Sequence, residues 1–169
     1  PDWVLARVNL AIATLNRQLE GDEDRALALA RAVVAEKADH LDAHYVIALL
    51  SFNRGDCATA VEHFETVRTG DPKDAYAAYF LAQCKVQQGD AAGALALYQS
   101  AIDLDPYLRS AYYGAFQAYQ RLGDREQATA MLDSYQRLDN NPRARLAEIK
   151  YTKMGPRATA RVAAQPTEP

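Results

Sequence analysis

The 169-residue chain has a mass of 18.6 kDa and contains 49% hydrophobic and 24% charged residues. These are the values of an ordinary globular protein, so they exclude wholesale disorder and a collagen-like polymer. With two cysteines, Cys57 and Cys84, the chain is not a disulfide scaffold, and two unpaired thiols are expected. No stretch reaches the 18 or more apolar residues of a membrane span, so no membrane insertion is predicted.

The net charge of −3 is unevenly distributed along the chain. Residues 1–139 hold 13 basic and 20 acidic side chains, whereas residues 140–169 hold six basic and two acidic ones. An acidic body argues against a nucleic-acid partner, because affinity for nucleic acid comes mainly from Lys and Arg that neutralise phosphates. The basic C-terminal stretch could contact an acidic partner, and the alternative is a solvated helix end with a flexible terminus.

An internal repeat is the most informative feature of the sequence. The dipeptide Gly-Asp recurs at a spacing of 34 residues, starting at Gly21, Gly55, Gly89 and Gly123. Four residues after each Asp stands an alanine, namely Ala26, Ala60, Ala94 and Ala128. Self-similarity at such a period is the signature of a repeat architecture. We therefore predict four repeated structural units rather than one globular domain.

Each unit is predicted to be a helical hairpin. Apolar residues at three- and four-residue spacings precede each Gly, which suits the left-handed cap that ends a helix. The following Asp can accept hydrogen bonds from the free amides of the next helix, and Pro72 or Pro106 stops that helix. The repeated Ala allows close approach of two helices. In the first unit three residues enter before Gly21, so its first helix should be longer or end irregularly.

The 34-residue unit resembles the tetratricopeptide repeat, with its small residue, Gly, Ala, aromatic and Pro in order, and residues 75–108 form the best copy. The resemblance implies an all-α, right-handed α-solenoid of four helical hairpins. A charged residue, Lys150, stands where the repeats place a small one, which predicts a C-terminal capping helix with nothing packed outside it. The expected divisions are repeats 1–40, 41–74, 75–108 and 109–142, a capping helix 143–154 and a flexible tail or linker 155–169.

A shorter resemblance concerns a larger parent protein. The run from Lys150 to Gly155 is similar to the end of the repeat region in large bacterial proteins that continue into FG-GAP/VCBS propeller repeats and an ASPIC/UnbV domain. This similarity implies that the chain is the helical module of a larger protein. A start at Pro-Asp-Trp agrees with that expectation. Cytoplasmic and exported locations both remain open.

The first helices of stacked hairpins line the concave face of a solenoid. Tyrosines stand ten residues before three of the glycines, at Tyr45, Tyr79 and Tyr113, and Tyr is common at binding hot spots. The alternative is that Tyr is simply a frequent family residue at this position. The expected neighbouring contacts in the groove are Leu49, Phe52, Asn53, Gln83, Gln87, Gln117 and Arg121. Aromatic and amide side chains fit an extended peptide, so we predict a groove that binds a peptide or protein segment.

Catalytic interpretations have less support in the sequence. His40 and His44 have a spacing that could present two imidazoles to a metal, but His44 occupies a packing column. Cys84 lies in a core position, and no Gly-rich phosphate loop is present. We therefore predict no catalytic residue, cofactor or metal. The basic clamp that some family members use for a chaperone's C-terminal carboxylate is missing.

Two other functions remain as alternatives to peptide binding. The first is a structural module that self-associates through an exposed first unit, which carries Trp3, Val4 and Leu5. The second is an accessory domain that positions a catalytic or propeller domain of a larger parent protein.

Overall fold

The computed structural model describes residues 3–150 and 153–160. These residues form eight α-helices, one short 3-10 helix and no β-strand, which confirms the predicted all-α fold. The elements are α1 (Trp3–Arg17), α2 (Asp22–Glu36), α3 (Leu41–Asn53), α4 (Cys57–Gly70), α5 (Ala75–Gln87), α6 (Ala91–Leu104), α7 (Arg109–Leu122), α8 (Arg125–Arg137) and η1 (Pro156–Ala158). Among the described residues, no helix is long and apolar enough to cross a membrane.

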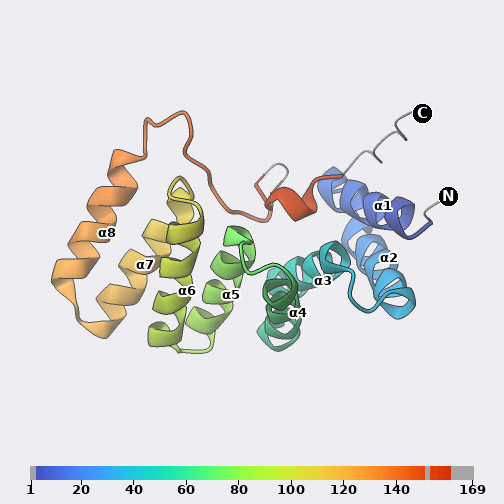
Figure 1. The fold of residues 1–169 in the computed structure, drawn as a ribbon, viewed down its shortest axis with the longest axis horizontal. Coiled ribbons are helices and arrows are strands. Elements are labelled where there is room, and N and C mark those ends of the chain that lie inside the picture. The colour runs from blue at the N-terminus through green and yellow to red at the C-terminus, as the bar shows by residue number, and fades with distance from the viewer. Residues whose placement is uncertain (1–2, 151–152, 161–169) are drawn as a thin grey trace, which may run out of the picture.

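Consecutive helices pair as four antiparallel hairpins that stack side by side into a curved array (Figure 1). The hairpin turns follow the predicted chemistry. Gly55 and Gly123 adopt φ values of 78° and 80°, a left-handed conformation that an L side chain rarely adopts. The aspartate after the glycine caps the following helix, as Asp90 shows by accepting a hydrogen bond from the Gly93 N–H at 2.8 Å.

The first hairpin departs from this pattern, as the three extra residues predicted. Helix α1 ends at Arg17, and Gln18 then takes a positive φ of 55°. Asp22 lies inside α2 instead of capping it, and its carboxylate accepts hydrogen bonds from Arg17 and from the Leu19 N–H. The Arg17 guanidinium lowers the pKa of Asp22 to about 2. The first helix therefore ends irregularly.

The core follows the line where the two helices of each hairpin meet. The repeated alanines Ala26, Ala60 and Ala94 have no exposed surface, which confirms that this column holds helices in close contact. Large side chains fill the space between neighbouring hairpins. The fully buried Phe64 ring lies edge-on to Tyr45, with centroids 5.7 Å apart, and stacks on Phe80 at 5.9 Å. These three rings join α3, α4 and α5 in one cluster.

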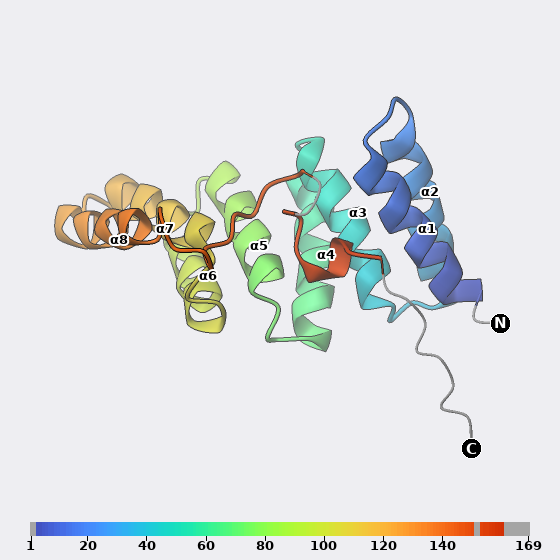
Figure 2. The same ribbon diagram turned by 90° about the horizontal axis from the view of Figure 1, so that it is seen from above.

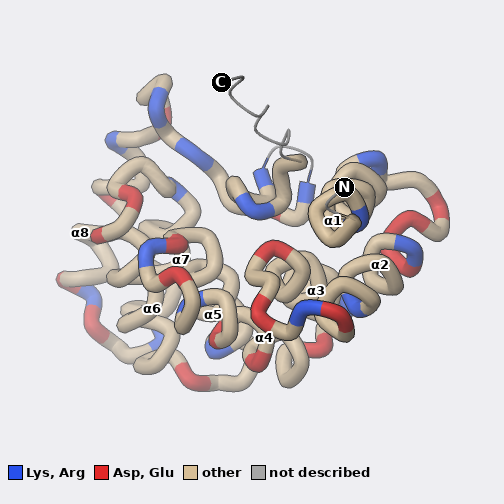
Figure 3. The backbone as a smooth tube through the Cα atoms, turned by 45° about the vertical axis from the view of Figure 1, so that its right-hand side comes forward, with Lys and Arg blue, Asp and Glu red and all other residues tan. Residues whose placement is uncertain are grey.

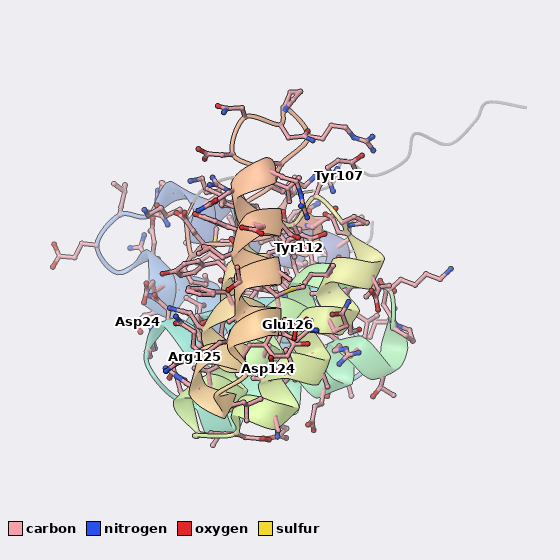
Figure 4. All side chains as sticks on the ribbon, turned by 90° about the vertical axis from the view of Figure 1, so that its left-hand side faces the viewer. Asp24, Tyr107, Tyr112, Asp124, Arg125 and Glu126 are labelled. Atoms are coloured by element: carbon pink, nitrogen blue, oxygen red, sulfur yellow. The ribbon has the colours of Figure 1, made fainter. Side chains whose placement is uncertain are left out.

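The predicted capping helix 143–154 is wrong. Over its described residues, 143–150 and 153–154, the backbone forms turns and extended chain instead of a helix. Helix α8 itself ends the array, and its outer face is polar, as the end of a solenoid requires. Figure 4 looks onto this end and shows Asp124, Arg125 and Glu126 at the start of α8. With the end already capped, no further helix is needed there.

After α8 the chain turns back along the array. We call residues 143–160 the C-terminal segment; residues 151–152 within it lie outside the described part. Figure 2 shows the segment passing over α7, α5 and α3 towards α1, and Figure 3 shows Lys and Arg positions recurring along it. Residues 155–160, expected as part of a flexible tail, pack against the solenoid through η1. The rest of that predicted tail, 161–169, lies outside the described residues.

A histidine pair between α3 and α4, His44 and His63, predicts that the stability of the fold depends on pH. The Nε2 of His44 lies 2.8 Å from the carbonyl oxygen of Ala38, so this nitrogen donates. Its Nδ1 then accepts the Nδ1–H of His63 at 2.7 Å. Burial, with a contribution from His44, lowers the pKa of His63 below its usual value of 6.5. The unfolded chain therefore binds a proton more readily, and stability is lost as the pH falls below about 6.5.

We expect the free energy of unfolding, measured by urea denaturation, to be smaller at pH 5.0 than at pH 7.5. A His63→Gln variant should lose part of that difference. The matched control is His40→Gln, which leaves the His44–His63 pair in place. An unchanged pH dependence in His63→Gln would show that this pair does not link protonation to folding.

Candidate binding groove on the concave face

The concave face is formed by the first helices of the hairpins, α1, α3, α5 and α7, and the C-terminal segment lies on it (Figures 1 and 2). The segment contacts all four of these helices or the turns that precede them. It enters at the start of α7, crosses α5 and α3, and reaches α1 at Asn16. The groove predicted from the repeat is therefore occupied by the chain itself.

The first contact is a short piece of parallel backbone pairing. The N–H of Arg145 donates to the carbonyl of Tyr107 at 2.7 Å, and the N–H of Arg109 donates to the carbonyl of Arg145 at 2.8 Å. Two residues later, the N–H of Ala147 donates to Oγ of Ser110 at 2.9 Å. These bonds satisfy backbone groups of the segment in the way that a sheet edge satisfies an added strand.

The second contact is centred on Tyr45. Its hydroxyl donates to the carbonyl oxygen of Met154 at 2.6 Å, and both side chains are buried. Burial raises the pKa of Tyr45 well above its usual value, so the hydroxyl stays protonated and able to donate. Gly155 follows with a φ of 93° and lies against the rings of Tyr45 and Tyr76. The groove here encloses backbone with no room for a side chain.

The third contact is an ion-pair cluster at Arg157. Its Nη1 lies 2.6 Å from Asp42, its Nε lies 2.7 Å from Asp74, and its Nη2 lies 2.5 Å from Asp71. The Arg157 side chain is only 11% exposed. Three carboxylates thus converge on one guanidinium. Asp42 lies in the first turn of α3, and Asp71 and Asp74 lie in the connection between α4 and α5. The arrangement uses the forked geometry of Arg, which matches several carboxylates at once.

A cleft of about 480 Å³ lies beside this cluster and shows the charge distribution of the groove. The solenoid contributes acidic side chains to its wall, and the C-terminal segment contributes basic ones. Its charged lining includes Asp71, Asp74, Asp105, Arg143, Arg145 and Arg157. Asp105 and Arg145 also form an ion pair of 2.8 Å across it. The acidic body and basic end noted in the sequence therefore meet in the groove.

The segment finishes against α1. The amide Nδ2 of Asn16 donates to the carbonyl oxygen of Ala158 at 2.8 Å, and Ala158 is buried. A second hollow, of about 400 Å³, lies between the C-terminal ends of α1 and α3 and is partly lined by Ile149. The contacts of the segment therefore extend over the whole concave side from α7 to α1.

The three tyrosines predicted as anchors differ in exposure along the array. Tyr45 has no exposed surface, Tyr79 is 9% exposed and Tyr113 is 42% exposed. Burial raises the pKa of Tyr79 to about 12. The exposed fraction of these tyrosines thus increases from α3 to α7. The segment contacts α7 at its start, at Arg109 and Ser110. In this conformation Tyr113 is the tyrosine of the three that an external molecule can contact.

The other predicted groove residues divide in the same way. Leu49 is fully buried and Phe52 is half-buried against Phe80. Three of the polar residues bind neighbouring helices: Asn53 donates to Glu23, Gln87 accepts from the thiol of Cys57, and Arg121 reaches the carbonyl of Val86. Gln83 is half-buried beside Tyr79, and Gln117 is exposed on α7. These predicted residues therefore do not form one continuous open surface.

The most extensive contacts come from residues that sequence reasoning did not select. These are Asp42, Asp71, Asp74 and Tyr76, together with Gly155 and Arg157 of the segment. A signal for them existed in the opposite charges of the body and the C-terminal stretch. That signal could not say which acids meet which bases, because the pairs lie 83 to 115 residues apart in the sequence.

The other reactive groups of the chain are its histidines and cysteines. No group of three or more His, Cys, Asp and Glu side chains there could hold a metal ion. His44 pairs with His63 rather than with His40. Cys57 and Cys84 are free and buried, and burial together with the neighbouring Cys57 raises the pKa of the Cys84 thiol. The groups that the concave face presents to the C-terminal segment are tyrosine, carboxylate and amide groups.

Stacked helical hairpins with an occupied concave face define a helical-repeat binding module. Two models of the tetratricopeptide repeat match the sequence, over residues 45–108 and 85–149, and together they span more than half of the chain. The chain belongs to the tetratricopeptide repeat family, whose members are in general non-catalytic scaffolds for protein–protein interaction. No curated protein matches the sequence.

Several solved structures have the same fold. A MamA fragment from residue 41 to the end, from Desulfovibrio magneticus RS-1, is 22% identical, with a TM-score of 0.72 over 80% of this chain and 75% of that chain. A structure described as MamA protein is 19% identical, with a TM-score of 0.73 over 82% and 74% of the two chains. MamA MSR-1 is 20% identical, with a TM-score of 0.69 over 80% and 76%. At these identities the likeness establishes the fold alone.

Proposed function

We propose that this protein is a non-catalytic scaffold that binds an extended polypeptide segment in its concave groove. One observation carries the proposal: the groove already holds residues 145–150 and 153–158 through backbone pairing, a tyrosine hydroxyl, an amide and a carboxylate cluster. None of these contacts depends on the occupant being covalently attached. A segment of similar chemistry from another molecule can use the same groups.

Part of the groove remains open beside the occupied part. Tyr113 is 42% exposed, and Gln117, one turn further along α7, is exposed as well. An incoming segment can contact these residues before it displaces the chain's own segment. The open end at α7 therefore provides a first contact, and the covered part from α5 to α1 provides the longer binding surface.

A photo-crosslinking experiment tests this function. The probe is a synthetic peptide of residues 143–160 in which benzoylphenylalanine replaces Met154, and the target is the full chain carrying Arg157→Ala, which weakens its own segment. We expect crosslinks to α3 and α5 around Tyr45, because the Met154 carbonyl accepts from that hydroxyl. A scrambled peptide is the control. Crosslinks confined to the convex helices, or equal labelling by both peptides, would contradict the proposed groove.

Self-association is a second candidate function, favoured by an exposed apolar stripe on α1. Trp3 is 70% exposed and Leu10 is 55% exposed on the outer face of this terminal helix. The other end of the array, α8, presents a polar face, so the complementary surface is the α1 stripe of a second copy. We expect a concentration-dependent mass in sedimentation equilibrium that Leu10→Ser abolishes. A mass that stays monomeric at all concentrations would exclude this alternative.

A further inference from the structure

We propose that the concave groove selects segments that contain glycine followed two residues later by arginine, a Gly-x-Arg pattern. The inference rests on the proposed function, because it names the kind of segment that the groove accepts. It follows from the way the solenoid holds Gly155 and Arg157 of its own chain. The partner is therefore a protein with an extended basic segment of this pattern.

The arginine position is a site built by the solenoid. Two of its three carboxylates are fixed by their own helix ends: one oxygen of Asp74 accepts the Ala77 N–H, and one oxygen of Asp71 accepts the Lys73 N–H. In both residues the other oxygen faces Arg157. The carboxylates are thus held in place by bonds that do not involve the guanidinium. Because these carboxylates are already ordered, little of their conformational entropy is lost when an arginine binds.

The cluster distinguishes arginine from lysine. Each nitrogen of the guanidinium has a different partner: Nε bonds Asp74, Nη1 bonds Asp42 and Nη2 bonds Asp71. A lysine ammonium is a single point and lacks the planar fork that spans three separate acceptors. Asp42 and Asp74 are buried, with side chains 10% and 7% exposed, so an occupant that supplies them no cation carries a desolvation cost.

The glycine position is defined by two independent features. Its φ of 93° belongs to a region that L side chains rarely adopt. A Cβ at this residue would lie 2.8 Å from the hydroxyl oxygen of Tyr45 and 2.8 Å from Cγ of Tyr76, closer than real Cβ atoms approach. Tyr45 is buried and donates to the occupant's backbone, so it cannot move aside without breaking that bond.

Two backbone contacts set the register between the glycine and the arginine. Tyr45 binds the carbonyl of the residue before the glycine, and Asn16 binds the carbonyl of the residue after the arginine. These donors come from α3 and α1, which belong to different hairpins. An occupant must therefore present a glycine and an arginine at the observed spacing to satisfy all four contacts together.

The chain's own segment competes with any external one. Attachment through a short connection gives it an effective concentration of about millimolar, which hides the groove from weak ligands. A test of selectivity therefore needs a full-length chain in which the attached segment is weakened. Gly155→Val does so through the Tyr45 and Tyr76 contacts, and Arg157→Ala does so independently through the carboxylates. Circular dichroism checks that both variants keep the helical array.

The experiment measures fluorescence anisotropy of a labelled peptide with the sequence of residues 150–160. We expect it to bind both weakened full-length variants at least tenfold more tightly than the unaltered chain. Peptides carrying Arg157→Lys or Gly155→Ala should each bind at least tenfold more weakly than the parent peptide. Adding Asp74→Asn to a weakened variant keeps the helix cap and should remove most of the preference for arginine. Glu126→Gln, an exposed carboxylate-to-amide change on α8 away from the groove, is the charge-matched control.

The outcomes separate the two proposals. If the parent peptide binds but the Arg157→Lys and Gly155→Ala peptides bind equally well, the Gly-x-Arg selectivity is wrong while peptide binding stands. If no peptide binds either weakened variant, both the selectivity and the groove function are overturned. Equal loss of parent-peptide binding in Asp74→Asn and in Glu126→Gln would show general charge attraction instead of a guanidinium site.

Discussion

Replacing Arg157 with alanine should weaken docking of the C-terminal segment by about 3 kcal/mol. The loss follows from burial, because the change removes the cation from Asp42 and Asp74 while both side chains stay largely shielded from water. Breaking a buried ion pair in this way typically costs about 3–5 kcal/mol. The array can respond by releasing the segment and hydrating the carboxylates. We therefore expect local opening in preference to complete unfolding.

Limited proteolysis combined with urea denaturation measures this effect. In the variant, cleavage near Lys153 and Arg145 should become rapid while the cores of α3 to α6 stay resistant. The matched control is Arg143→Ala, because Arg143 belongs to the same segment but is exposed and lies over the ring of Tyr107. Such a contact contributes about 0.5–1 kcal/mol. Equal protease resistance of the two variants would contradict the role given to the carboxylate cluster.

Replacing Phe64 with alanine should lower the free energy of unfolding by about 4 kcal/mol. Phe64 has no exposed surface and lies between Tyr45 and Phe80, so truncation leaves a cavity where three helices meet. Substitutions of this kind cost about 3–5 kcal/mol, a large part of the roughly 5–15 kcal/mol that holds a typical domain folded. The cavity also removes support from the Tyr45 hydroxyl that binds the segment.

Urea denaturation followed by circular dichroism provides the measurement. Phe116→Ala is the control, because this half-buried ring contacts Tyr113 at the more open end of the array. Its replacement should cost about 1–2 kcal/mol, since part of the ring is already in water. If the two variants lose the same stability, Phe64 is not the centre of the packing between the middle hairpins.

The repeated hairpins could be predicted because their signals are local. A glycine with positive φ, an aspartate cap and a small alanine act within a few residues of one another, and the period of 34 residues repeats each signal. The irregular first unit was predictable for the same reason, from three extra residues before Gly21. Only Asp22 behaves differently there, because the longer turn lets it bind Arg17.

The fate of the C-terminal segment could not be predicted in this way. Leu146, Ile149 and Lys153 have a helical spacing, but a local pattern competes here with long-range contacts. Backbone pairing with Tyr107 and Arg109 and the Arg157 ion pairs stabilise an extended path instead. The same contacts determine the exposure of the predicted tyrosines. Tyr45 lies on α3 and is covered by Met154 and Gly155.

Amide hydrogen exchange of the unaltered chain tests the central claim that the C-terminal segment occupies the concave groove. The N–H groups of Arg145 and Ala147 donate to Tyr107 and Ser110 across the groove, so the account predicts that both exchange much more slowly than unstructured peptide. Arg157→Ala should speed up their exchange. Exchange of Arg145 and Ala147 at the rate of free peptide in the unaltered chain, while α3 to α6 remain protected, would contradict the claim.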